Sequence, residues 1–207
     1  MQQQQVLFLG SSSASRQQLL KEVGIQFTLL KQTADEAQCD WGQTLQKVVE
    51  SIALFKMQHV IMPVGKEGDI AFVLTADTLG QDSKGHINGK PTSKEHAIEL
   101  IQEARAGMST GTAFCLEKKE YKNQQWHTVA RIVRYVQAQY QFIIPDEWMD
   151  YYFSHCNALQ VSGAIAIEGV GSLFLREMHG SYTTVMGLPV FELRESLVDI
   201  GFFDKKP

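Results

Sequence analysis

Short apolar runs alternate with a helical pattern over the first 30 residues, and this alternation limits the fold more than any other feature. Residues 6–10 read VLFLG, a wholly apolar stretch that is typical of a buried strand. Residues 15–24, SRQQLLKEVG, are typical of a short helix, with a serine that can cap its start and a glycine that can end it. A second apolar run follows at 25–30. This order predicts an α/β chain.

Helical periodicity is strongest over residues 44–62, and the later part of the chain is richer in strands. The expected helices after the first are 44–62, 92–107, 146–153 and 189–201, and the expected strands are 70–77, 110–119, 127–144, 163–169 and 171–178. Thr92 and Glu95 have the spacing of a capping box at the start of one helix. We expect one domain over residues 1–207, with a long, twisted mixed sheet flanked by helices and residues 1–5 as a frayed terminus.

Composition argues against several classes of function. The net charge is −4, so no overall positive field attracts a nucleic acid polymer or an anionic membrane. Cys39, Cys115 and Cys156 are far apart and form no CxxC pair, which argues against a disulfide framework and a structural zinc site. The apolar runs are too short for a signal peptide or a membrane span. We therefore expect a cytoplasmic protein.

A serine cluster between the first strand and the first helix is the first candidate site. The segment GSSSASR places Ser11, Ser13 and Ser15 directly before Arg16. Backbone N–H groups and a helix N-terminus attract anions, and an arginine adds a planar fork of donors for phosphate. The same residues could equally form a capped helix with a solvated arginine. The sequence alone leaves both readings open.

Two lysines and two acids are weaker candidates. Lys56 follows the inward positions of its helix, so it either extends its ammonium to solvent or meets an acid or phosphate. Asp77 follows an apolar strand, where a carboxylate can bind a metal, act as a base or cap a turn. Lys90 lies in a glycine-proline turn and Glu36 in a polar loop, and either could be an ordinary surface residue.

Taken in order, these segments resemble the Maf family, the septum-formation-inhibitor-like nucleoside triphosphate pyrophosphatases. The resemblance runs from Val6 to Ile200. It rests on LFLGSSSASRQQLLKEVGIQF, DE at 35–36, IALFK, TADT, NGKP, IPDEWMDYY, SGAIAIEGVG and GSYTTVMGLPVFEL. It implies an ITPase-like fold in which two lobes enclose a cleft, and a possible homodimer. It further implies hydrolysis of a nucleoside triphosphate to the monophosphate and pyrophosphate with Mg²⁺ or Mn²⁺.

The resemblance also implies roles for single residues. Asp77 matches the proton acceptor, and Glu36 with Asp77 matches the acidic positions near the metal. The phosphate-binding positions are matched by Ser11, Ser13, Arg16, Lys56 and Lys90, and the positions linked to substrate choice by Ser15, Thr78 and Glu168.

The chain also departs from the family pattern. Ala14 and Ser15 replace a proline and an arginine or tryptophan of the family's serine loop. Thr78 resembles the subgroup that acts on dTTP and UTP, whereas Glu168 resembles the subgroup that acts on 7-methyl-GTP. Two further interpretations are a nucleotide-binding protein that has lost turnover and an interaction protein of cell division.

Overall fold

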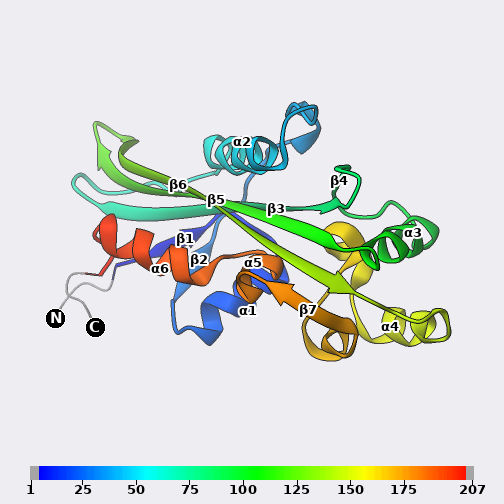
Figure 1. Ribbon diagram of the computed structural model, residues 1–207. Helices are drawn as coiled ribbons and strands as arrows, with labels where there is room; N and C mark the ends of the chain where they lie inside the picture. Colours follow the sequence, from blue (N-terminus) through cyan, green and yellow to red (C-terminus); the bar gives the residue numbers. More distant parts are fainter. Residues whose placement is uncertain (1–4, 204–207) are drawn as a thin grey trace.

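The apolar run at the start of the chain becomes the short strand β1 (Leu7–Leu9), which pairs in parallel on both sides. Its neighbours are β2 (Phe27–Leu29) and the much longer β3 (Ile70–Asp82). In this computed structural model, which describes residues 5–203, the sheet has seven strands and is open and twisted (Figure 1). The α/β prediction with a mixed sheet is confirmed.

The remaining strands are antiparallel. The sheet order is β2-β1-β3-β5-β6-β7, and β4 pairs with the far end of β3. The bounds of these strands are Ile87–Asn88 for β4, Met108–Lys122 for β5, Gln125–Phe142 for β6 and Leu175–His179 for β7. The β5–β6 hairpin is the longest pairing, and it matches the two long strands expected around a polar turn.

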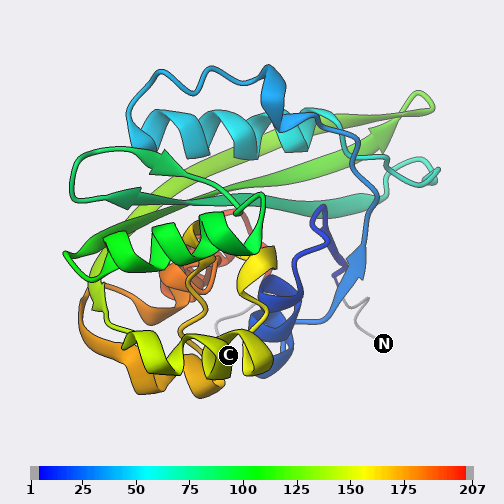
Figure 2. The same ribbon diagram turned by 90° about the vertical axis from the view of Figure 1, so that its right-hand side faces the viewer.

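Helices cover both faces of the sheet (Figures 1 and 2). The helix α2 (Leu45–Gln58) packs on one face, where it encloses a small core with β3 and β5. The other face carries the larger core under α1 (Ala14–Glu22), α3 (Lys94–Ala104), α4 (Met149–His155) and α6 (Val190–Asp199). The short helix α5 (Tyr182–Val185) also lies there. Because α2 lies on the face of the sheet opposite the other helices, it can form one wall of a cleft and they can form the other.

Five 3₁₀ turns complete the described elements. They are η1 (Glu36–Gln38), η2 (Asp146–Trp148), η3 (Ala158–Gln160), η4 (Ser162–Ala164) and η5 (Gly169–Phe174). No helix among residues 5–203 is both long and apolar enough to cross a membrane. The three cysteines are free thiols.

Several expectations about elements were wrong. Residues 163–169 form no strand, because Gly163, Ala164 and Gly169 have φ angles of 65°, 59° and 56°, which no extended strand allows. The expected strand 171–178 begins as the turn η5 and is extended only from Leu175. Thr92 does not cap α3; Ser93 does, by accepting a hydrogen bond from His96 N. The expected frayed terminus lies, except for its last residue, outside the described residues.

The difference in length between β1 and β3 exposes part of β3. β1 pairs only with residues 72–74, and β4 pairs only with residues 80 and 81. Within the described chain, residues 75–79 therefore have a strand partner on the β5 side alone. The sequence predicted that β3 would end at Asp77, whereas the strand continues to Asp82. Asp77 thus lies beside an uncovered edge and not at a strand end.

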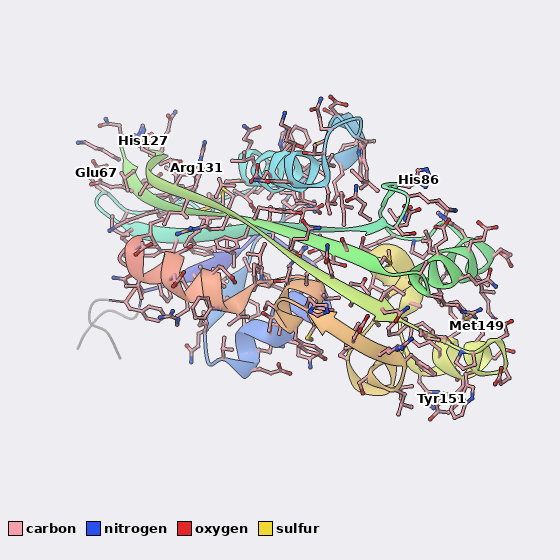
Figure 3. All side chains as sticks on the ribbon, viewed as in Figure 1. Glu67, His86, His127, Arg131, Met149 and Tyr151 are labelled. Carbon is pink, nitrogen blue, oxygen red and sulfur yellow. The ribbon has the colours of Figure 1, made fainter. Side chains whose placement is uncertain are left out.

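A cluster of ion pairs around the buried Glu117 joins β5 to β6, away from the uncovered part of β3. Glu117 is 0% exposed and accepts a hydrogen bond from Thr128 Oγ1 at 2.8 Å. Its carboxylate pairs with Lys119 Nζ at 2.5 Å and with Arg131, labelled in Figure 3, at 2.6 Å. Burial opposes ionisation, but the hydrogen bonds and the charge of Lys119 outweigh it and lower the pKa of Glu117.

Replacing this carboxylate should destabilise the protein in a pH-dependent way. Glu117→Gln should lower the free energy of unfolding at neutral pH by about 3 kcal/mol, because a buried pair loses its anion. The pKa of Glu117 is lower in the folded protein than in the unfolded chain, so its ionisation stabilises the fold at pH values above the ordinary glutamate pKa. That stabilisation is lost as the pH falls through the pKa of Glu117 in the folded protein.

Urea unfolding of the wild type and the variant across pH measures this difference. The two stabilities should converge in acid. Glu120→Gln is the matched control, since Glu120 lies on the same strand without an ion pair in the described chain. A constant difference at every pH would contradict this account.

Candidate active site

A cleft of about 680 Å³ lies beside the uncovered edge of β3. One wall comes from the loop before α2 and from α2 itself, and the other from α1 and residues 157–168 and 185–187. Gly10 lines the cleft at the end of β1 and lets the chain pack closely there, since a Cβ would lie 2.7 Å from Val60 Cγ1 and 2.9 Å from Thr75 Cγ2. Two walls that enclose a cleft agree with the expected two-lobed fold.

The serine loop turns the chain from β1 into α1. Ser13 caps the helix by accepting a hydrogen bond from Arg16 N at 3.5 Å, and Ser11 Oγ accepts one from Ser13 N at 3.3 Å. Both serines line the cleft, and Ser11 is buried. The loop therefore presents hydroxyls and a helix N-terminus to the same cavity, as an anion-binding site requires.

Arg16 is buried at the base of this loop and fixes three separate segments. Its Nε donates to Gly187 O at 2.7 Å, one terminal nitrogen donates to Ser11 Oγ at 3.1 Å, and the other donates to Thr78 Oγ1 at 2.9 Å. Burial lowers the pKa of Arg16, while the charges of Asp77 and Glu36 oppose that shift. A guanidinium has five N–H groups, so one donor remains on each terminal nitrogen for a ligand.

A chain of threonines continues from Arg16 into the sheet. Thr78 Oγ1 lies 2.9 Å from Thr112 Oγ1, and Thr112 donates to Thr184 O at 2.7 Å. The side chains of Thr112 and Thr184 are fully buried. Sequence reasoning identified Thr78 but missed Thr112, Thr184 and Gly187, the last of which has a φ of +109°. The fragment TTVMGLP, noted only for the resemblance, contains both Thr184 and Gly187.

Lys56 is the centre of the charged cluster. It lies in the last turn of α2 and is 6% exposed, so it does not extend to solvent. Its Nζ lies 2.7 Å from Asp77 Oδ1 and 2.7 Å from Glu36 Oε1. The structure thus brings together three residues that the sequence placed on a helix, a strand and a loop.

Asp77 combines deep burial with an unused oxygen. Its Oδ2 is buried and has no hydrogen-bond partner in the described chain. Burial raises the pKa of Asp77, and the nearby charges of Lys56 and Arg16 counteract that rise. A buried carboxylate oxygen is normally satisfied by a hydrogen-bond donor, a water molecule or a cation. Asp77 Oδ2 can therefore receive one of these from a ligand. Among the described residues that line the cleft, this oxygen is the one buried side-chain polar atom without a hydrogen-bond partner.

The other candidate residues lie farther out. Lys90 is exposed, lines the cleft and makes no ion pair within the described residues. Ser15 and Glu168 are half-buried and also line the cleft, from α1 and from the turn before η5. The structure therefore places every predicted site residue around one cavity, with Lys90, Ser15 and Glu168 outside the Arg16–Lys56–Asp77 cluster.

A divalent cation fits the donor set only in part. Residues 5–203 contain no group of three metal-binding side chains. Glu36 and Asp77 supply two carboxylates, and the free Asp77 Oδ2 supplies an open position. Mg²⁺ usually binds one or two carboxylates and completes its shell with substrate phosphates and water, so this pair is compatible with such an ion.

Comparison with known proteins identifies the family of this chain. The family model described as Maf-like protein matches residues 6–200. The chain is 29% identical over 205 residues to a dTTP/UTP pyrophosphatase of Neisseria meningitidis, covering 95% of this chain and 94% of that protein. It is 28% identical to a protein of the same name in Acinetobacter baylyi, covering 95% of this chain and all of the other, and 26% identical to one in Fusobacterium nucleatum, covering 95% and 96%. The chain belongs to the Maf-like protein family.

The threonine chain can be tested apart from the charged cluster. Thr112→Val keeps the shape of the side chain but removes its bonds to Thr78 and Thr184, so we expect a loss of about 1–3 kcal/mol in unfolding free energy. Because Arg16 and Thr78 lose their support, affinity for inorganic tripolyphosphate in calorimetry should fall severalfold.

Thr75→Val is the matched control for this experiment. Thr75 is equally buried, but it bonds to Ala53 O in α2. That variant should lose stability and keep its affinity for tripolyphosphate. Equal affinities in both variants would show that the threonine chain does not position the anion site.

Proposed function

We propose that the protein is a nucleoside triphosphate pyrophosphatase, which converts a nucleoside triphosphate into the monophosphate and pyrophosphate. The observation that carries the proposal is the buried Asp77, with one oxygen on Lys56 and the other free, inside a cleft lined by cationic side chains. The printed names of the relatives support the same chemistry. Phosphoryl transfer needs little covalent chemistry from a protein, because positioning and electrostatics supply most of the rate.

Asp77 acts as the general base in this mechanism. Its carboxylate orients a water molecule and accepts its proton as the water oxygen bonds to phosphorus. The bond between that phosphorus and the bridging oxygen of pyrophosphate breaks, and pyrophosphate leaves with the electron pair. Burial raises the pKa of Asp77 and so makes it a stronger base than a solvated aspartate, while the charge of Lys56 favours the ionised form.

The remaining site residues hold the phosphates. Ser11, Ser13 and Arg16 line the cleft at the helix N-terminus, and Arg16 has two N–H groups that its three hydrogen bonds leave unused. Lys56 and Lys90 supply further positive charge. Hydrogen bonds to charged groups contribute about 1.5–3 kcal/mol each, so several of them can hold a triphosphate without a deep pocket.

We propose Glu36 and Asp77 as the protein ligands of a divalent ion, Mg²⁺ or Mn²⁺. The bound ion would polarise the phosphoryl group and stabilise the leaving pyrophosphate. The pairing of both carboxylates with Lys56 holds them close together before the ion and the substrate arrive.

For the substrate we propose dTTP and UTP. The relatives compared above carry that name, and Thr78 has the residue type of the dTTP and UTP subgroup. A nucleotide panel with Mg²⁺ or Mn²⁺, assayed for pyrophosphate, should give a kcat/KM for dTTP and UTP at least about tenfold above that for other nucleotides, a difference of about 1.4 kcal/mol. A preference for 7-methyl-GTP would instead assign the choice of base to Glu168.

Asp77→Asn tests the proposed base. Loss of a general base should lower kcat by about 10²–10⁴-fold, while nucleotide still raises the melting temperature. Asp82→Asn is the matched control, because Asp82 is also a buried acid of β3 but accepts hydrogen bonds from Lys84 N and His86 N in the next turn.

The control should keep wild-type kcat at a small cost in stability. Normal turnover by the Asp77 variant would exclude the role given to that residue. Nucleotide-induced stabilisation of the wild type without any pyrophosphate release would identify a binding protein that has lost turnover.

A further inference from the structure

We propose that Trp41 is the stacking wall of a nucleobase subsite at the end of the cleft nearest Lys90. This inference rests on the proposed function and adds to it the place where the base binds. Trp41 is the one aromatic residue among the described residues that line the cleft, and 38% of it is exposed. Stacking on an aromatic ring is a general way to bind a base, because every base has a π face.

The ring of Trp41 is held in place without being covered. Its Nε1–H donates to Glu36 O at 3.2 Å, so the turn that supplies Glu36 also orients the indole. Asp40 fixes the next residues by accepting hydrogen bonds from Gly42 N at 2.9 Å and from Gln43 Nε2 at 2.8 Å. Within the described chain no other ring packs on Trp41. A ring that is held in place and 38% exposed can bind a planar ligand at a small cost in conformational entropy.

The position of the ring along β3 suits a base. A Cβ on Gly89 would lie 3.7 Å from Cη2 at the edge of the Trp41 ring and 3.9 Å from Leu79 Cδ2, so this edge of the indole lies beside Gly89, close to Leu79. Leu79 is two residues beyond Asp77 on the same face of the strand, a rise of about 7 Å. That separation is of the size of the ribose that joins the reacting phosphate of a nucleotide to its base.

The opposite wall of the cleft is tied to the same turn. Ser162 Oγ donates to Asn88 O at 2.8 Å, and Gly163 N donates to Gly89 O at 2.9 Å. The segment that contains them, residues 157–168, reaches the turn from the other side of β3 (Figure 2). Its side chains in the cleft include the apolar Val161 and the amide of Gln160. A base on Trp41 would therefore face an apolar contact and an amide that can bind its polar edge.

Trp41 could instead act only through its N–H, by fastening the loop that carries Glu36. Two substitutions separate these roles. Trp41→Phe keeps an aromatic face and loses the N–H, whereas Trp41→Leu loses both. If the face matters, Trp41→Leu should raise the KM for UTP about tenfold with little change in kcat, and Trp41→Phe should stay near the wild type.

Fluorescence supplies a readout that does not depend on turnover. In a Trp126→Phe/Trp148→Phe background, Trp41 is the single tryptophan, because the chain contains three. Trp126 and Trp148 do not line the cleft. Adding UTP to this protein, with Asp77→Asn to prevent hydrolysis, should quench the emission in a saturable way. Inorganic tripolyphosphate carries the same phosphates without a base, so it should bind and leave the emission nearly unchanged.

Three results would overturn the proposal: an unchanged KM in Trp41→Leu, a KM equally raised in Trp41→Phe and Trp41→Leu, or equal quenching by tripolyphosphate and UTP. Thermal melting of each variant checks that it is folded. Pyrophosphate release by the wild type tests the proposed function separately. A protein without turnover could still show quenching by UTP, and an active enzyme could lack it.

Discussion

A lysine ammonium buried between two carboxylates is the interaction on which the rest of the site depends. Lys56 brings together the carboxylates of Glu36, from a loop, and Asp77, from a strand. Without the ammonium between them, these two carboxylates would repel each other. A buried charge is costly unless it is paired, so this contact fixes the end of α2 against the uncovered edge of β3. The same contact leaves one oxygen of Asp77 free, and that oxygen gives the cleft its chemistry.

On the other face of β3, Arg16 joins separate segments as Lys56 does on the first face. It joins the serine loop, Thr78 and Gly187, which lie far apart in the sequence. The two cations therefore hold the two walls of the cleft on one strand. Because Thr78 and Asp77 are consecutive residues of a strand, their side chains point to opposite faces, which is why one strand can supply both walls.

Sequence periodicity predicted the inward position of Lys56 because an α-helix repeats every 3.6 residues. It could not decide whether that lysine meets an acid, since Glu36 and Asp77 lie outside the helix. The resemblance joined these residues, and the structure gives their distances. Thr112 and Thr184 were not predictable, because their contacts join β5 to α5 and no local pattern marks them. The continuous apolar run at 164–167 indicated burial correctly, but the prediction of a strand over 163–169 was wrong, since a hydrophobic pattern does not reveal positive φ angles.

The balance of charge explains how the site is stable without a ligand and still attracts an anion. Arg16 and Lys56 carry two positive charges, and Glu36 and Asp77 carry two negative charges, so the inner cluster is neutral. A neutral cluster avoids the cost of an unpaired buried charge. A triphosphate that enters the cleft can accept hydrogen bonds from Arg16 and Lys56, but the neutralisation of its charge needs cations from outside the cluster. Lys90 is exposed at the rim and unpaired within the described residues, and a divalent ion arriving with the substrate would supply the rest. The inner charges thus position the reacting groups, while the outer charges respond to the substrate.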